Sequence, residues 1–287
     1  MKGVFAGRPA LFQVGLLLSL ILAGAILAGA LSFLFADNLS ENAGLIRLYQ
    51  FISAIFTFLL PAVLVAYFCS DSPEDYLFMK HLPGPRALVW VVVSMFLLSP
   101  VITFTGVVNK MMKLPAFLEP VERWMQSMEA AAEELTTLLL SQSDIFSLLA
   151  NLLVIAVTAA VTEEFFFRGT LQRIIGKWTS NPHVVIWVVA FLFSALHLQF
   201  YGFIPRMLLG AYFGYLLLWS GSIWLPVLAH FINNSVAVIG MSNEKWKDNK
   251  LISGEIADSD LLMFGTMAAL FLVLFCYCVK RLRKELG

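Results

Sequence analysis

The chain has 287 residues, of which 60% are apolar and 13% are charged, and its mean hydropathy is +0.83. Charged residues usually make up about a quarter of a soluble domain, so this composition excludes a soluble protein and indicates a polytopic membrane protein. The formal net charge is zero, and the composition gives no sign of nucleic-acid binding.

Apolar runs of roughly 20 residues are long enough to cross a membrane. The chain contains about eight such runs, which predict an all-α, polytopic membrane helical bundle. The expected spans are residues 10–36, 46–69, 87–108, 146–176, 183–203, 205–219, 222–240 and 260–280.

The segment between the third and fourth spans has a different pattern. From Leu114 to Leu139, apolar residues recur at helical spacing, and glutamates are expected on the opposite face (Glu119, Glu122, Glu129 and Glu133). This pattern predicts one amphipathic interfacial helix. The chain would then comprise three N-terminal spans (1–110), the amphipathic segment (111–145), a core of spans (146–240), and a last loop, final span and basic tail (241–287).

Basic residues between the spans predict the orientation of the chain. Lys and Arg are more numerous in the N-terminus, the 70–86 loop, the connection after the fourth span and the C-terminal "KRLRKELG" than in the alternate loops. We therefore expect a multi-pass protein with both termini in the cytoplasm.

Ionisable side chains deep inside the spans are functional candidates because they are costly in lipid. The candidates are Glu163, Glu164 and Arg168 in the fourth span, His197 in the fifth, and His230 with Asn233 and Asn234 in the seventh.

The spacing of these residues predicts which of them meet. Glu163 lies seventeen residues before Ser180, in the turn between two spans, and His197 lies seventeen residues after it. In an antiparallel helix pair with equal rise, the two side chains are at equal depth. Glu164 and Arg168 are four residues apart and share a helix face.

Together these side chains suit water-mediated hydrolysis. A carboxylate beside an imidazole can activate water, and a second imidazole with a carboxamide can stabilise an oxyanion. The chain has no GxSxG and no HExxH motif. A divalent metal such as zinc, bound by Glu163, His197 and His230, remains open, although we favour a site without a tightly bound cofactor.

Three short motifs carry a resemblance to a known family. "EEFFFR" (163–168), "FSALH" (193–197) and "HFINN" (230–234) resemble the EExxxR, FxxxH and HxxxN/D motifs of the CPBP (Abi) family of CAAX proteases and bacteriocin-processing enzymes. The three motifs occur in the order that the family has, and the resemblance covers roughly residues 146–240.

The resemblance implies an intramembrane endopeptidase of the type II CAAX prenyl protease kind. It implies that Glu163 and His197 activate water, that His230 and Asn234 form the oxyanion hole, and that Glu164 and Arg168 support them. The implied partners are membrane lipids and a peptide or protein substrate, with or without a lipid modification. The implied location is a bacterial cytoplasmic membrane.

A function of another class stays open. The same polar pocket could serve binding alone in a non-catalytic immunity protein, scaffold or transporter subunit. The absence of an internal sequence repeat argues against a transporter.

Overall fold

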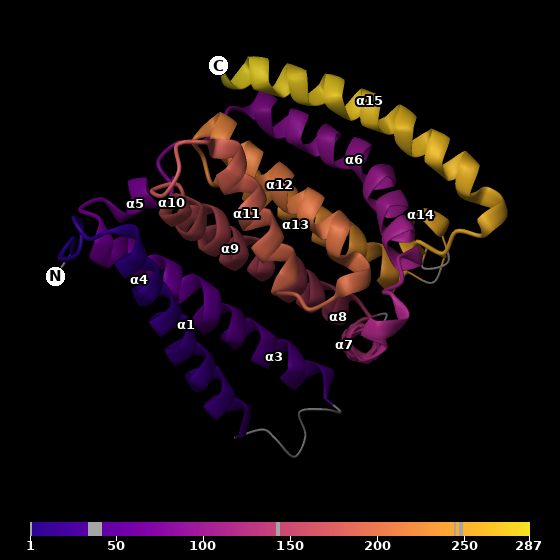
Figure 1. The fold of residues 1–287 in the computed structure, drawn as a ribbon, viewed down its shortest axis with the longest axis horizontal. Helices are drawn as coiled ribbons and strands as arrows, with labels where there is room; N and C mark the ends of the chain where they lie inside the picture. The colour runs from indigo at the N-terminus through magenta and orange to yellow at the C-terminus, as the bar shows by residue number, and fades with distance from the viewer. Residues whose placement is uncertain (1, 34–41, 142–143, 244, 247–248) are drawn as a thin grey trace.

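The computed structural model describes residues 2–33, 42–141, 144–243, 245–246 and 249–287, and every regular element among them is a helix (Figure 1). Within these residues seven helices or helix runs are long and apolar enough to cross a membrane. They are α1 (Ala10–Phe33); α3 (Ala43–Ala54), η1 (Ile55–Leu59) and α4 (Leu60–Cys69); α6 (Pro85–Met111); α8 (Ile145–Asn151), η3 (Leu152–Thr158), α9 (Ala159–Glu164), η4 (Phe165–Leu171) and α10 (Gln172–Ile175); η5 (Phe200–Gly202) and α12 (Phe203–Ser220); α13 (Trp224–Ser242); and η6 (Asp258–Asp260) and α15 (Leu261–Leu286). The predicted polytopic helical bundle is confirmed, although residues 34–36 of the first expected span lie outside the described residues.

The fifth span is shorter than the sequence predicts. Helix α11 (Pro182–Ala195) has 14 residues and is about 21 Å long, which is less than the hydrocarbon thickness of about 30 Å. The chain leaves the helix after Ala195, and Leu198 adopts a left-handed φ of 55°. The expected span 183–203 was therefore too long, and His197 lies in the turn after the helix.

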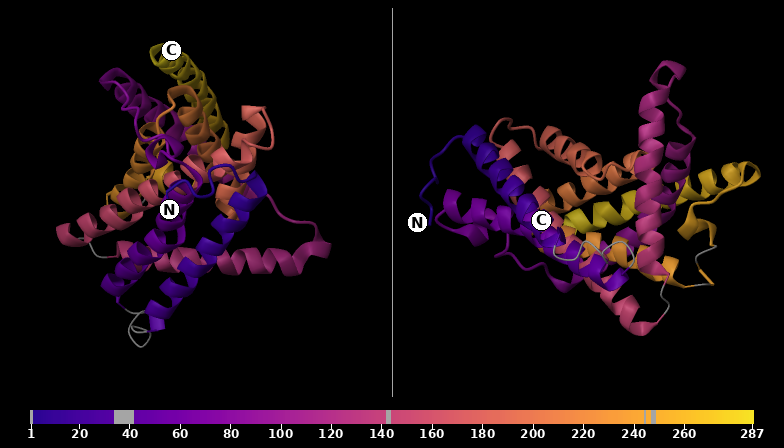
Figure 2. Two further views of the ribbon diagram at one scale, coloured as in Figure 1. Left: turned by 90° about the vertical axis from the view of Figure 1, so that its left-hand side faces the viewer. Right: turned by 90° about the horizontal axis from the view of Figure 1, so that it is seen from below.

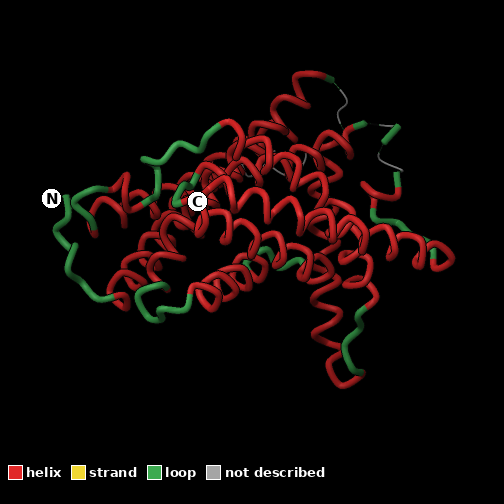
Figure 3. Tube along the Cα trace, turned by 90° about the horizontal axis from the view of Figure 1, so that it is seen from above, coloured by secondary structure: helices red, strands yellow, loops and turns green. Residues whose placement is uncertain are grey.

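The spanning helices lie side by side in an order that Figure 1 shows clearly. Helices α1 and α3–α4 form one flank, and α6 and α15 form the other. The α8–α10 run, α11, α12 and α13 lie between them. Both termini, α5 (Pro73–Tyr76) and α10 are near one end of the bundle, whereas α7 (Glu119–Leu140), α8 and α14 (Lys250–Ser253) are near the opposite end. Loops gather at the ends of the bundle (Figure 3).

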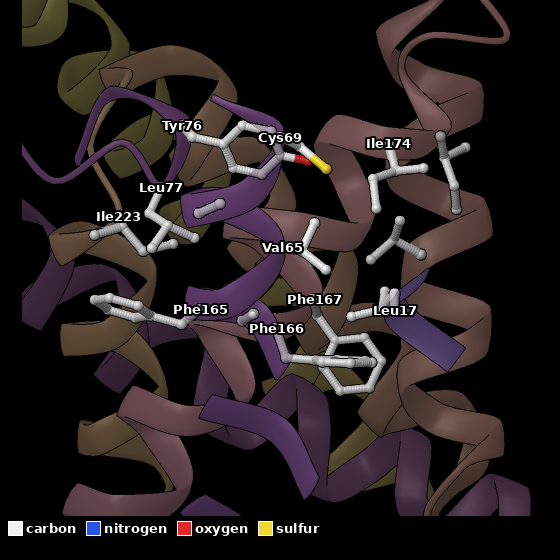
Figure 4. Packing of buried hydrophobic residues seen from close by; sticks show 14 of the residues in the cluster. Leu17, Val65, Cys69, Tyr76, Leu77, Phe165, Phe166, Phe167, Ile174 and Ile223 are labelled. Atoms are coloured by element: carbon white, nitrogen blue, oxygen red, sulfur yellow. The ribbon is translucent and has the colours of Figure 1, made fainter. Parts of the chain in front are cut away.

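Three consecutive phenylalanines anchor the α8–α10 run to its neighbours. Phe165, Phe166 and Phe167 are buried in a cluster with residues of α1, α4 and the loop that follows α4 (Figure 4). The Phe166 ring lies edge-on to Phe58 at 5.2 Å and to Phe167 at 4.9 Å. Because lipid is as apolar as these side chains, close packing rather than removal from water stabilises this contact. The packing fixes the rotation of the helix that carries the two adjacent glutamates.

The amphipathic segment forms helix α7, which lies crosswise to the spanning helices (Figure 2). Its half-buried face includes Met125 and Met128, but also Glu122 and Glu129. The prediction that the glutamates all face away from the apolar side was therefore wrong for these two. Glu122 accepts a hydrogen bond from the Leu114 amide at 3.1 Å. The spacing of apolar residues along the helix does not predict such a local hydrogen bond.

Helix α7 is fastened to the bundle at its C-terminal end. Arg47 of α3 donates to the Leu139 carbonyl at 3.0 Å and to Asn151 Oδ1 at 2.8 Å, and Asn151 Nδ2 also donates to Leu139 at 2.8 Å. The Trp124 ring lies 5.2 Å from Phe200 of η5. Helix α7 is thus held beside the turn that contains His197.

Candidate active site

The centre of the site is an ion pair with no exposure to solvent. Arg168 donates to Glu164 Oε1 at 2.7 Å, and both side chains are 0% exposed. The guanidinium also donates to the Gly210 carbonyl at 2.9 Å and lies over the Phe193 ring at 4.5 Å. A Cβ atom at position 210 would lie 3.2 Å from Arg168 Nη2 and 3.0 Å from Phe193, so a glycine allows α12 to approach this closely. The pair therefore joins the α8–α10 run to α11 and α12.

His230 of α13 is the third member of this cluster. Its Nδ1 lies 2.7 Å from Glu164 Oε1, and its ring stacks on Phe213 at 5.2 Å. An ionised carboxylate only accepts hydrogen bonds, so the Nδ1 hydrogen of His230 points to Glu164. This contact leaves His230 Nε2 facing Glu163. The spacing of residues in the sequence gave no indication that His230 contacts Glu164.

Glu163 is placed differently from its neighbour Glu164. Its Oε2 atom lies 4.0 Å from His197 Nε2 and 3.9 Å from His230 Nε2. Within the described part of the chain this oxygen is buried and has no hydrogen-bond partner. The structure thus brings together the two residues that were expected at equal depth, and it leaves Glu163 with an acceptor oxygen directed between two imidazoles.

The ring of His197 is oriented by helix α11, which ends just before it. Nδ1 lies 2.7 Å from the Phe193 carbonyl, four residues earlier. A carbonyl oxygen only accepts, so Nδ1 carries the hydrogen, and Nε2 of the neutral ring has a lone pair directed toward Glu163. This nitrogen is suited to accept a hydrogen bond from water.

The two asparagines of α13 lie next to each other at the same site. Asn234 Nδ2 donates to the Ile155 carbonyl of η3 at 2.9 Å, and Asn233 Nδ2 donates to Asn234 Oδ1 at 3.1 Å. A carboxamide nitrogen carries two hydrogens, so each side chain keeps one further N–H to donate.

All of these groups except the buried pair line one cavity of about 570 Å³. Its polar lining contains Glu163, His197, His230, Asn233 and Asn234, together with Gln50, Gln199 and Arg206. Sequence reasoning missed the last three, although Arg206 is a charged residue in an apolar run and could have been found on that ground. A smaller apolar groove between α6, α12 and α13 adjoins the cavity and shares Ile102, Leu209, Asn233 and Ala237 with it.

The helix that carries the glutamates is not uniform. The π-helical segments η3 and η4 come directly before and after the six α-helical residues of α9, which end with Glu163 and Glu164. π-Helical turns often occur at functional sites, where they change the direction in which side chains point. The two carboxylates consequently sit on the one regular turn between two wide ones.

The separation of the donor atoms of Glu163, His197 and His230 determines whether they could bind a metal ion. Glu163, His197 and His230 are ligand types that zinc uses, but donors around tetrahedral zinc lie about 3.4 Å apart, less than the 3.9 and 4.0 Å found here. Among the described residues, no group of three or more His, Cys, Asp and Glu side chains could hold a metal ion. These side chains do not fit zinc in their present positions, whereas their spacing suits a water molecule with hydrogen bonds of about 2.8 Å on each side.

Comparison with known proteins finds a match over the part of the chain that carries these residues. Residues 145–236, which include all of the motifs, match the family model described as type II CAAX prenyl endopeptidase Rce1-like. The uncharacterized protein YpbD of Bacillus subtilis is 30% identical over 90 residues, which are 30% of this chain and 43% of YpbD. This chain thus matches less than half of that relative. No solved structure matches it.

The apolar helices define an integral membrane protein, and a polar cluster is buried between them. Over residues 145–236 the chain is similar to the type II CAAX prenyl endopeptidases of the CPBP, or CAAX protease, family. The resemblance that the three motifs carry is thereby confirmed.

Glu164→Gln should destabilise the protein strongly, because Arg168 would be left as a buried charge without its counter-ion. Breaking a buried pair from one side typically costs about 3–5 kcal/mol. Thermal and denaturant unfolding of the purified protein in detergent would measure the loss. Glu163→Gln is the matched control and should change the stability by less than about 1 kcal/mol. Equal stability of the two variants would contradict the structural role of Glu164.

Proposed function

We propose that this protein is an intramembrane endopeptidase that hydrolyses a peptide bond of a membrane-associated substrate. The observation that carries the proposal is the Glu163 oxygen, which is buried, lacks a hydrogen-bond partner within the described residues and faces two imidazole nitrogens at 3.9 and 4.0 Å. A water molecule at this point could donate one hydrogen to Glu163 and the other to His197 Nε2. Its oxygen lone pair would then be directed into the cavity.

The reaction balances without a covalent intermediate. The water oxygen attacks the carbonyl carbon of the scissile bond, and Glu163 accepts the proton that the water loses. The carbonyl oxygen becomes an oxyanion. When the C–N bond breaks, the proton passes from Glu163 to the leaving nitrogen, and the products are a carboxylic acid and an amine.

His230 and Asn234 are proposed to stabilise the oxyanion. His230 Nδ1 donates to Glu164 at 2.7 Å, which directs the Nε2 edge of the ring toward the cavity. In the proposed reaction a hydrogen on Nε2 is donated to the oxyanion. Asn234 lines the cavity and not the adjoining groove, whereas Asn233 lines both. This placement supports Asn234 as the second donor.

The adjoining groove supports a lipid-modified substrate. Its described lining is mostly apolar, with Met95, Phe96, Leu98 and Val236 among its residues, and it opens beside the catalytic cavity. An aliphatic chain could lie in this groove while the peptide to which it is attached enters the cavity. A non-catalytic binding protein would use the same two spaces, but it would not need a carboxylate oxygen that lacks a hydrogen-bond partner among the described residues and lies beside an oriented imidazole.

The oxyanion assignment gives a direct activity test. Candidate substrates are small membrane-associated peptides that remain uncut in cells without this protein, identified by mass spectrometry and then assayed in proteoliposomes. Removing one oxyanion donor typically slows turnover about 100- to 1000-fold. We expect that loss for Asn234→Ala, whereas Asn233→Ala should stay within roughly tenfold of wild type.

Both variants must first be shown to be folded and inserted in the membrane. An inactive Asn233→Ala with an active Asn234→Ala would reverse the assignment. No difference in peptides between cells with and without the protein would favour the binding-pocket alternative.

We also propose that no tightly bound metal is needed for cleavage. Treatment with a chelator should therefore leave the cleavage rate unchanged. A rate that is lost on chelation and restored only by zinc would refute this proposal.

We further propose that the protein lies in a bacterial cytoplasmic membrane with both termini on the cytoplasmic side. The segments rich in Lys and Arg lie at the end of the bundle that carries both termini (Figure 1). They are the N-terminus, the 70–86 loop, the connection after α10 and the C-terminal tail. The opposite end carries α7 and α14.

Cysteine labelling should separate these two ends. Ser180 and Asn249 are exposed at opposite ends, and the exposed Cys276 would be replaced by serine first. In intact cells an impermeant maleimide should label Asn249→Cys and should label Ser180→Cys only after permeabilisation, because basic loops stay in the cytoplasm. Labelling of both positions from outside would contradict this topology.

A further inference from the structure

One charged side chain of the cavity has no part in the mechanism described above. Arg206 of α12 is the one lysine or arginine among the described residues that line the cavity. Its Nη2 donates to Gln199 Oε1 at 2.6 Å and its Nη1 to the Gln199 carbonyl at 3.3 Å. Gln199 is neutral, and a partly buried cation that is hydrogen-bonded to a neutral partner is costly without a nearby negative charge.

Two acidic side chains act electrostatically on Arg206, and they are Glu129 and Glu163. Glu163 faces the water position between the two histidines. Glu129 belongs to α7, on its half-buried face, and one of its carboxylate oxygens is buried without a hydrogen-bond partner in the described part of the chain. The contact of Trp124 with Phe200 holds this stretch of α7 beside η5, next to Gln199.

We propose that Arg206 is a specificity-determining residue that binds a carboxylate of the substrate, and that the charge of Glu129 offsets the charge of Arg206 when no substrate is bound. The inference rests on the proposed function, because it deepens the account of what that cavity binds. It makes the preferred substrate a peptide with a carboxylate, at its C-terminus or on an acidic side chain, close to the scissile bond.

The chemistry of arginine supports this assignment. The guanidinium has five N–H donors in a planar fork that matches a carboxylate, and hydrogen bonds to Gln199 occupy two of them. Gln199 comes two residues after His197, so an anion on Arg206 would lie near the activated water. A substrate carboxylate and Glu129 have the same charge and would compete for the cation, which links substrate entry to the position of α7.

Binding of matched peptides would test the proposal without depending on cleavage. The probes are three fluorescein-labelled hexapeptides that carry an S-farnesyl cysteine and otherwise neutral residues. The neutral peptide has a C-terminal amide and an internal Gln. Of the two acidic peptides, one has a free C-terminus instead of the amide, and the other keeps the amide and has Glu in place of the Gln. Fluorescence anisotropy with the full chain in phosphatidylcholine nanodiscs gives the affinities. Wild type should bind one of the two acidic peptides about 10- to 100-fold more tightly than the neutral one.

Arg206→Gln should abolish this preference, and Arg206→Lys should retain part of it. Glu129→Gln should tighten binding of the preferred acidic peptide a few-fold, whereas Glu133→Gln, an exposed glutamate on the same helix, should have no effect. Thermal unfolding of each variant shows that the site is intact. Equal binding of all three peptides by wild type, a preference that survives Arg206→Gln, or no binding of any peptide would overturn the proposal.

Cleavage of the same peptides distinguishes this inference from the proposed function. Cleavage without any preference for a carboxylate would refute the role of Arg206 and leave the protease assignment standing. Binding with the expected preference but with no cleavage of any peptide by wild type would support the role of Arg206 and count against the protease assignment.

Discussion

The ion pair of Glu164 and Arg168 is the interaction on which the rest of the site depends. Both side chains are fully buried, and the pair is bonded further to Gly210 and His230, so one cluster links the α8–α10 run, α12 and α13. Charges in such surroundings are tolerated only when they are paired and hydrogen-bonded. The cost of separating them would keep these helices in one register, and that register positions the groups around the cavity.

The two adjacent glutamates have different environments for this reason. The Oε2 atoms of both have no hydrogen-bond partner in the described residues, but Glu164 has its negative charge balanced by Arg168 and its Oε1 atom bonded to two donors, whereas Glu163 Oε2 faces His197 and His230. Two neighbouring carboxylates with such different surroundings are suited to two roles. In our account Glu164 positions His230, and Glu163 exchanges protons with water. The phenylalanines that follow them pack against α1 and α4 and prevent the helix from rotating.

The all-helical bundle and the proximity of Glu163 to His197 could be predicted from the sequence, because apolar run length and distance from a turn depend only on helix rise. The early end of α11 could not be predicted, since a left-handed turn at Leu198 interrupts an apolar run that has no local signal for it. The contact of Glu164 with His230 depends on the π-helical segments and on how α13 packs, which are tertiary effects. The half-buried position of Glu129 on α7 likewise depends on how α7 packs beside η5, which is distant in the sequence.

The central claim is that Glu163 is the base and that Glu164 is not. The most direct measurement is the single-turnover cleavage rate of purified Glu163→Gln in proteoliposomes, with its unfolding temperature measured on the same sample. Glutamine keeps the size of the side chain but cannot accept the proton of water, so our account predicts a protein as stable as wild type with no detectable cleavage. A Glu163→Gln protein that cleaves substrate at the wild-type rate would contradict the account.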